Sequence, residues 1–472
     1  MDVTPEEITD GPIAPTLLAL AAPLIAQNLV RVLNQVVDTL WLGRVDEPAV
    51  AAVGLNFPVL AVLFGLVTVG IAGTHILVAQ RVGAEETAAA RRLAVNGAAL
   101  SATLGLALAV GVVLAAETVI DLLGAGPAVR PLAVAYLTIV GLFFPFTAAS
   151  DTIERGFVGW GDTRAALYIN LVTVATNVAL DPFLILGVGP VPALGVEGAA
   201  LATGLGYAAG FAAAVVLVTG RRSSLVLSRA DLTFSRSDLR EIVGVGAPLS
   251  GQQLAGQSAR VAIVGVVVTV GGAPGLAAYT VGARVASVAF VPAAGFGNAA
   301  QSMIGQNLGA ERPDRAGATV RAGVLIAAGA LGLVGLIQWL VPGLIVGLFV
   351  PSFTEAGRRL TVAYLEILAY SYWAMGASSV VLAAFNGASR TQTSFVVDVV
   401  KYWGLRIPAA VAALPPGAYV LAGVSVGGLD LGVRAIFWAV TVSNVAAAVG
   451  AGLYYLWCRR PMFGRAVARA AD

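Results

Sequence analysis

The sequence contains about twelve apolar runs of ~20 or more residues, divided by short polar segments. A helix of that length crosses the hydrocarbon core of a bilayer and satisfies its own backbone hydrogen bonds. Only 11% of the 472 residues are charged, against about a quarter in soluble domains. We therefore predict an all-α polytopic membrane protein with twelve transmembrane helices, over 14–42, 49–79, 93–117, 129–153, 164–188, 194–219, 242–270, 275–305, 318–348, 360–384, 393–414 and 432–457.

The two halves of the chain repeat the same short motifs in the same order. Pro23 and Pro248 open corresponding spans at an offset of 225 residues, and Gln80 and Gln306 close the next span at an offset of 226. The other corresponding motifs are Gln27 with Gln252, Ala51-Ala52 with Ala277-Ala278, Gly83-Ala84-Glu85 with Gly309-Ala310-Glu311, and Phe157-Val158-Gly159 with Phe385-Asn386-Gly387. Spans one to six and seven to twelve are therefore homologous halves.

An even number of spans in each half means that both halves enter the bilayer the same way up. Their pseudo-twofold axis then runs along the membrane normal, with a cleft between two six-helix bundles. We predict an N-terminal lobe over 1–220, a cytoplasmic linker over 221–240 and a C-terminal lobe over 241–472.

Alternate loops differ in their arginine content. The poorer set holds Arg44, Arg130, Arg358, Arg359 and Arg434. The richer set holds Arg81, Arg91, Arg92, Arg155, Arg164, Arg221, Arg222, Arg229, Arg236, Arg240, Arg312, Arg315, Arg321, Arg390, Arg459, Arg460, Arg465 and Arg469. Because cytoplasmic loops carry the excess of basic residues, we predict a multi-pass protein of the cell membrane with both termini in the cytoplasm.

One apolar span, Leu167 to Gly189, carries polar side chains within a narrow sector of one helical face, namely Asn170, Thr173, Asn177 and Asp181. A carboxylate at this depth is costly in hydrocarbon and should face the bundle interior or a watery cavity. Pro182 lacks an N–H, so we expect a local break and freed carbonyls beside the acid. These oxygens suit a cation site. The alternative is a polar seam that only holds helices together.

The first span carries a similar stripe, formed by Gln27, Arg31, Asn34 and Asp38. Arg31 lies about two turns from Asp38 on this stripe. A permanent ion pair between Arg31 and Asp38 would keep the carboxylate ionised and weaken its use as a proton carrier. The sequence leaves this alternative open.

In these motifs the chain resembles the multidrug and toxic compound extrusion (MATE) family. The residues that carry the resemblance are Pro23, Asn34, Asp38-Thr39, Gly43-Arg44, the Gln80…Gly83-Ala84 turn and the Gly159…Gly161-Asp162-Thr163-Arg164 turn. The resemblance runs from about Pro23 to the end of the twelfth span. It implies a two-lobed antiporter that exports organic cations in exchange for Na⁺ or H⁺.

The resemblance also implies a set of site residues. Asp38 and Asp181 should meet inside the N-terminal lobe, with Asn177 and Thr203 as further cation ligands and Tyr136 beside them. The supporting positions are Pro23, Arg31, Asn34 and Asn170. Two acids in one poorly solvated pocket cannot both ionise easily, so the pair can hold a proton or a hard monovalent cation. The residue types do not choose between Na⁺ and H⁺.

The C-terminal half does not repeat this chemistry. Ala409 occupies the position equivalent to Asp181 at the 228-residue offset of Gly159 and Gly387. Glu366 is the alternative acid. Asp398 and Lys401 are spaced i, i+3 and are predicted to pair. The single histidine, His75, corresponds to Gln301 at the 226-residue offset, so a hydrogen-bonding role fits both halves.

Several other functions are disfavoured. One His and one Cys offer neither a catalytic set nor a metal centre beyond a possible Na⁺, so no enzyme activity or cofactor is expected. A net charge of +2 argues against nucleic acid. We expect a monomer surrounded by membrane lipids that handles small organic cations. A lipid-linked saccharide flippase of the same superfamily remains the alternative, because Arg31, Arg260 and Arg284 could line a basic cleft.

Overall fold

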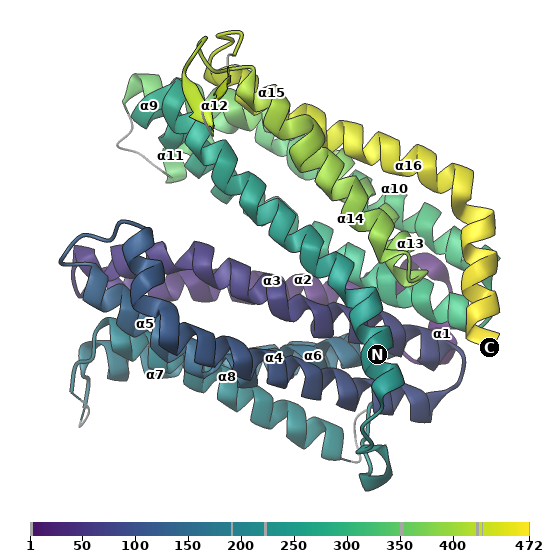
Figure 1. The fold of residues 1–472 in the computed structure, drawn as a ribbon. Coiled ribbons are helices and arrows are strands. Elements are labelled where there is room, and N and C mark those ends of the chain that lie inside the picture. The colour runs from purple at the N-terminus through teal and green to yellow at the C-terminus, as the bar shows by residue number, and fades with distance from the viewer. Residues whose placement is uncertain are drawn as a thin grey trace.

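Long helices lie alongside one another in two bundles in the computed structural model, which describes residues 3–189, 192–220, 224–349, 354–421, 424–426 and 428–471 (Figure 1). Arg221 and Arg222, at the start of the predicted linker, lie outside the described residues. The first bundle holds α2 (Ile13–Leu42), α3 (Glu47–Gly83), α4 (Thr87–Leu122), α5 (Arg130–Leu142), α6 (Phe144–Trp160), α7 (Thr163–Leu186) and α8 (Val196–Thr219). The second holds α9 (Arg236–Gly309), α10 (Pro313–Leu340), α11 (Pro342–Phe349), α12 (Glu355–Ala369), α13 (Tyr372–Gly387), α14 (Thr391–Val399), η2 (Val400–Arg406), α15 (Ile407–Val411) and α16 (Val433–Ala471).

The helices of the described segments account for the twelve predicted spans. Eight helices are individually long and apolar enough to cross a membrane, and two bent pairs, α5 with α6 and α12 with α13, bring the number to ten. Gly272 has non-helical φ and ψ angles and divides α9 into two lengths. The continuous run α14–η2–α15 supplies the twelfth segment. The predicted fold class is confirmed.

The two bends occur at corresponding points of the two halves. The axes of α5 and α6 differ by 50°, and those of α12 and α13 by 46°. Phe143 and Ser371, which lie at the bends, are 228 residues apart, the offset of Gly159 and Gly387. The backbone repeat therefore extends to the irregular parts of the helices.

Three short elements were not predicted. A short helix, α1 (Pro5–Asp10), begins with a Thr4 capping box in which the Thr4 hydroxyl accepts from the Glu7 N–H at 3.2 Å. A two-stranded antiparallel hairpin, β1 (Tyr419–Leu421) and β2 (Val424–Val426), precedes α16. The 3₁₀ turn η1 (Arg229–Asp231) lies between the bundles along the chain. These elements are too short for hydrophobic periodicity to reveal them.

The first helix of the N-terminal half also packs against the second bundle. Leu17, Leu20 and Leu24 of α2 share a buried cluster with Phe296 and Met303 of α9. The other end of α2 carries Asn34 and Asp38 toward α7. One helix thus contacts both bundles along its length.

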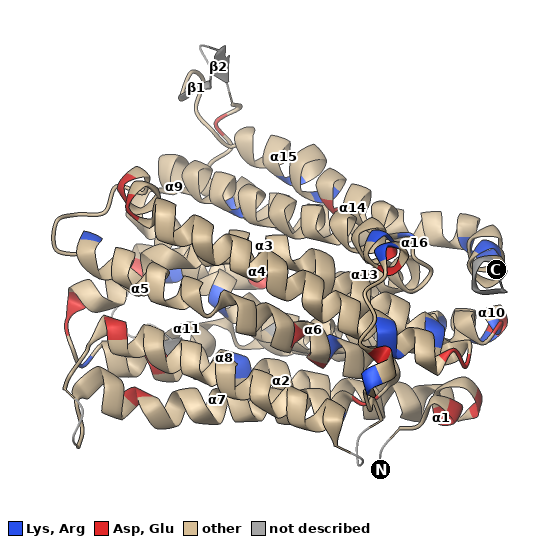
Figure 2. Cartoon of the chain, turned by 60° about the horizontal axis from the view of Figure 1, so that its bottom comes forward, with Lys and Arg blue, Asp and Glu red and all other residues tan. Residues whose placement is uncertain are grey.

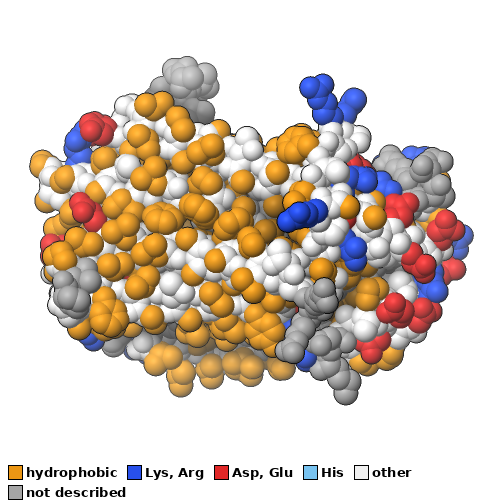
Figure 3. Space-filling model, turned by 90° about the horizontal axis from the view of Figure 1, so that it is seen from below, with side chains coloured by type: hydrophobic (Ala, Val, Ile, Leu, Met, Phe, Trp, Pro, Cys, Tyr) orange, Lys and Arg blue, Asp and Glu red, His pale blue; other side chains and the backbone are white. Residues whose placement is uncertain are grey.

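The surface is organised as a membrane protein requires. Apolar side chains cover a broad middle band, and charged side chains gather toward the end that holds both termini (Figures 2 and 3). In a membrane, lipid chains surround this band. Its apolar side chains therefore need no other protein to cover them.

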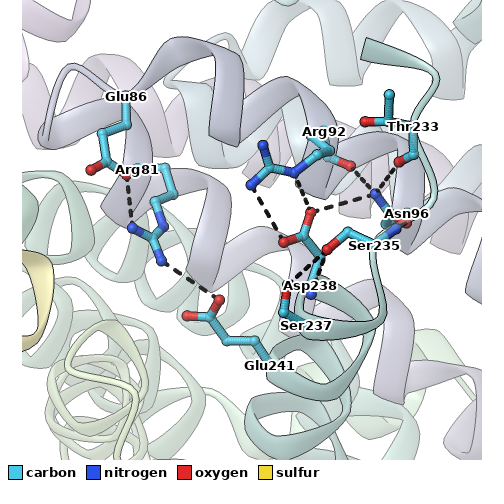
Figure 4. Close-up of polar contacts among 9 residues, drawn as sticks. All are labelled: Arg81, Glu86, Arg92, Asn96, Thr233, Ser235, Ser237, Asp238 and Glu241. Atoms are coloured by element: carbon cyan, nitrogen blue, oxygen red, sulfur yellow. Dashed lines mark hydrogen bonds and ion pairs between the residues drawn. The ribbon is translucent and has the colours of Figure 1, made fainter. Parts of the chain in front are cut away.

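Polar contacts fix the start of α9 to the first bundle at this end (Figure 4). Arg92 Nε of α4 donates to Asp238 Oδ2 at 2.7 Å, and Asn96 Nδ2 donates to the Thr233 carbonyl at 3.0 Å. Arg81 of α3 lies 3.6 Å from Glu241. The chain therefore enters the second bundle while held against α3 and α4.

Candidate functional site

The acid-bearing helix α7 runs through its proline. Asp162 begins the helix by accepting the Ala165 N–H at 2.9 Å, and Gly187, with φ of 70°, ends it. Pro182 does not end α7, which continues to Leu186. Pro182 lies in the last turns, where fewer hydrogen bonds depend on the chain beyond it. Its missing N–H still leaves the Val178 carbonyl without its usual helical donor.

Four predicted site residues come together between α2, α7 and α8. Asn177 reaches Asp181 Oδ1 at 3.4 Å and Thr203 Oγ1 at 3.5 Å. With its amide turned to satisfy its neighbours, the Asn177 nitrogen donates to Asp38 Oδ1 at 3.0 Å and to Asn34 Oδ1 at 2.8 Å. Its oxygen then accepts the Thr203 N–H at 3.1 Å. Asn177 therefore links three helices at one point.

A small residue lets these helices approach closely. A Cβ at Gly206 of α8 would lie 2.7 Å from the Thr173 carbonyl of α7. Because only glycine fits there, α8 packs near enough for Thr203 to reach Asn177.

The Asp181 carboxylate is incompletely bonded. The residue is 0% exposed, and its Oδ2 has no hydrogen-bond partner among the described residues. Asp38, half-buried, contacts it directly. A buried carboxylate oxygen without a donor is unfavourable unless a proton or cation occupies the site. The arrangement can therefore hold a monovalent cation between the two acids.

The supporting residues surround this point. Tyr136 of α5 is 8% exposed, and its hydroxyl contacts Thr203. Asn170 lies two turns before Asn177 on α7 and is buried, with no partner for its Oδ1 in the described segments. Pro23 lies inside α2.

Arg31 does not pair with Asp38, which answers the alternative left open above. Its Nη2 lies 3.4 Å from Asp151 and 3.3 Å from Glu154, both on α6. Seven residues separate Arg31 from Asp38, about 10 Å along a helix, whereas α6 offers two carboxylates at the level of Arg31. Sequence reasoning missed these two acids, although Asp151, Glu154 and Arg155 are an unusual charge cluster within an apolar span.

The second bundle carries a different polar group. The predicted pair of Asp398 and Lys401 is confirmed, and Gln252 Nε2 also donates to Asp398 Oδ2 at 2.5 Å. Lys401 belongs to η2, a π-helical segment. Ala409 lies in α15, and Glu366 is a half-buried residue of α12. The Asp398 carboxylate therefore has a partner within the protein for each oxygen, Lys401 for Oδ1 and Gln252 for Oδ2.

A cavity of about 550 Å³ lies between the two bundles. Both bundles supply its walls, and its polar lining includes Thr68, His75, Arg155, Gln252, Arg260 and Asp398. This volume is within the range of small-molecule sites. Arg31 and Arg284 are not among its lining residues, so two of the three arginines proposed for a basic cleft are absent from it.

Reciprocal hydrogen bonds between the halves close the end near the termini. Gln80 of α3 donates to the Gly387 carbonyl at 2.7 Å, and Gln306 of α9 donates to the Gly159 carbonyl at 2.8 Å. These are the repeat-related residues of the sequence. Their side chains connect the bundles in both directions and hold them together at this end.

His75 joins the same contact. Its ring nitrogens lie 2.8 Å from Gln301 Nε2 and 2.7 Å from Ser302 Oγ. Gln301 is its counterpart in the repeat, and the predicted hydrogen-bonding role is confirmed. Ser302 also donates to the Val158 carbonyl at 2.9 Å.

Known proteins share both the sequence and the fold. The family model MatE matches residues 23–183 and 248–412. The chain is 28% identical over 397 residues to the probable multidrug resistance protein YoeA of Bacillus subtilis, covering 82% of this chain and 84% of that protein. It is 27% identical to the probable multidrug resistance protein NorM of Pseudomonas putida, covering 97% and 98%. A solved multidrug resistance transporter of this kind, described as outward-facing, superimposes with a TM-score of 0.88 at 22% identity, covering 97% of this chain and 98% of that one.

Proposed function

This chain belongs to the MatE family, and from that premise we propose that it is a secondary active efflux antiporter. It exports amphipathic organic cations in exchange for H⁺ or Na⁺. It acts as a monomer in the cell membrane with both termini in the cytoplasm. The multidrug names of its relatives support the class of substrate. The arginine-rich loops and the shared end of the termini support the orientation.

One observation carries the proposal: the buried Asp181 has an oxygen without a donor and lies beside Asp38. Thr203 adds a hydroxyl oxygen, and the Asn177 amide, which contacts Asp38 and Thr203, holds these groups in place. Carboxylate and hydroxyl oxygens suit a hard cation, and the same acids suit a proton. The coupling ion binds here in the proposed cycle.

The helix that carries Asp38, α2, connects the proposed ion site to the contact between the two bundles. Binding at Asp38 acts on the outer part of α2, whereas Leu17, Leu20 and Leu24 of the same helix pack on the second bundle. Pro23 lies within this packed part and weakens the helix locally. Ion binding therefore biases the contact between bundles, and each ligand favours a different state of the cycle.

The flippase alternative loses its main support. Arg31 is bound by Asp151 and Glu154, and Arg284 does not line the cavity. Of the three arginines proposed for a basic cleft only Arg260 lines the cavity, and the multidrug names of the relatives favour a small exported compound over a lipid-linked saccharide.

The test is dye and fluoroquinolone efflux in pump-deficient cells under separate Na⁺ and H⁺ gradients. Asp181→Asn should abolish efflux, whereas Glu366→Gln, which changes an acid of the other bundle, should keep it. The gradient that suffices for the unmodified protein identifies the ion. Normal efflux by Asp181→Asn would remove the ion site from α7.

A further inference from the structure

The walls of the cavity between the bundles carry an excess of positive charge. Its charged lining residues are Arg155, Arg260 and Asp398. Asp398 is already bound by Lys401 and by Gln252, so it offers nothing to a ligand. Arg155 and Arg260 make no ion pair with any described residue.

Arg155 is the less usual of the two. It is half-buried within an apolar span, and its Nη1 is shielded from solvent without a hydrogen-bond partner in the described part of the chain. Asp151 and Glu154 lie near enough to attract Arg155, but their hydrogen bonds go to Arg31. An unpaired guanidinium at membrane depth is costly and marks a functional site by default.

The other polar groups of the cavity fit the same conclusion. Gln253, Gln257, Asn298 and Asn386 line it with amide groups that donate to an anion as readily as they accept from a cation. In a site partly shielded from water, two unpaired guanidinium groups repel a simple cation and attract a carboxylate or phosphate.

We propose that this cavity binds an anionic group of the exported compound, with Arg155 and Arg260 as its contacts. The preferred compounds among the exported organic cations are therefore zwitterionic amphipaths, which carry an acid as well as an amine. This inference rests on the proposed efflux function and specifies its substrate class.

The probes are a fluoroquinolone, which carries a carboxylate and an amine, and its methyl ester, which keeps only the amine. Binding of each to the purified protein at pH 7 is followed by the fluorescence of the drug. The unmodified protein should bind the acid about tenfold or more tightly than the ester, as expected for a charge-assisted hydrogen bond. Equal affinities would overturn the proposal.

Variants assign the preference to the two arginines. Arg155→Gln should bind acid and ester equally while keeping its affinity for the ester, which shows that it is folded. Arg155→Lys should retain part of the preference, and Arg260→Gln, at an exposed position, should lower it. Arg284→Gln removes an exposed arginine outside the cavity and is the matched control. An unchanged preference in both Arg155→Gln and Arg260→Gln would contradict the assignment.

Two further arms separate the possible outcomes. Binding selectivity without efflux of either compound would remove the efflux function and leave the anion site, whereas efflux without selectivity would do the reverse. Competition of the acid by short-chain phosphatidylglycerol in the unmodified protein but not in Arg155→Gln would identify a lipid headgroup as the ligand and overturn the assignment to the exported compound.

Discussion

The two bundles share a backbone plan but differ in how their buried charges are used. In the first bundle, Asp181 keeps one oxygen without a donor and lies against another acid. In the second, Asp398 is bound by Lys401 and Gln252. A satisfied acid stabilises one structure, whereas an unsatisfied acid responds to a proton or cation. The difference indicates that the fold was repeated and the under-bonded acid, the proposed ion site, was not.

The sharpest way to break this comparison is to move the acid. Asp181→Ala combined with Ala409→Asp places a carboxylate at the equivalent point of the second bundle. Efflux should stay at the level of cells without the protein, because neither Asp38 nor Asn177 has a counterpart there: the equivalent residues are Ile263 and Leu405. Dye efflux measures the result. Recovery of efflux would mean that the two bundles are interchangeable, and Asp181→Ala alone is the control.

The contact between the halves near the termini should be weakened by a similar amount whichever half carries the substitution. A Cβ at Gly83 would lie 1.9 Å from the Gln306 carbonyl oxygen, and one at Gly309 would lie 2.0 Å from that of Gln80. Gly83→Ala and Gly309→Ala should each weaken closure by about 3 kcal/mol, or roughly 100-fold. The readout is maleimide labelling of Ala79→Cys in a Cys458→Ser background, since Ala79 is buried at this contact.

The matched control is Gly329→Ala, because a Cβ there meets nothing within 4 Å. Slow labelling in both glycine variants would show that these helices do not seal the end near the termini.

Stability should separate the two sets of buried acids. Lys401→Met leaves Asp398 without its cation and should lower the free energy of unfolding by about 3 kcal/mol. Adding Asp398→Asn to this variant should restore most of the lost free energy of unfolding. Asp181→Asn, by contrast, removes an under-bonded carboxylate and should not destabilise the protein. SDS titration in mixed micelles measures the free energy of unfolding of all three variants. A lower value for Asp181→Asn would mean that the charge of Asp181 stabilises the fold.

The smallest expected effect concerns single hydrogen bonds. Gln80→Ala and Gln306→Ala should each weaken closure by about 1 kcal/mol, measured by the same cysteine labelling. Gln80→Ala should have the larger effect, because Gln80 also accepts from the Ser389 hydroxyl at 3.2 Å, whereas Gln306 Oε1 has no partner among the described residues. A larger effect of Gln306→Ala would show that the accepted bond of Gln80 does not contribute to closure.

Much of the fold could be predicted because the bilayer allows few structures. Apolar length locates the spans, and the repeat of Gln80 and Gln306 relates the halves. The bend at Phe143 is followed by Pro145, which interrupts helical hydrogen bonding. The bend at Ser371 has no proline, and its hydroxyl bonds back to the Leu368 carbonyl at 2.9 Å, so only the structure reveals it.

The site was harder to predict where it depends on distant partners. Helical spacing places Asn177 and Asp181 on one face, but it cannot give the acids of α6 that bind Arg31. Similarly, the repeat shows that Gln80 and Gln306 are equivalent without showing that each contacts the other half. Internal similarity reports ancestry, whereas contact depends on how the halves pack.

The crossed glutamine bonds have the form of an isologous dimer, in which residue i of one subunit contacts residue j of the other and j contacts i. A six-span chain with one such glutamine and one such glycine would carry both sides of its own interface. Two identical subunits could then close around a shared cleft before any gene fusion. After fusion each half can change alone. A carboxylate in one half only, as in α7, is a difference that a homodimer cannot acquire, because a mutation there changes both subunits.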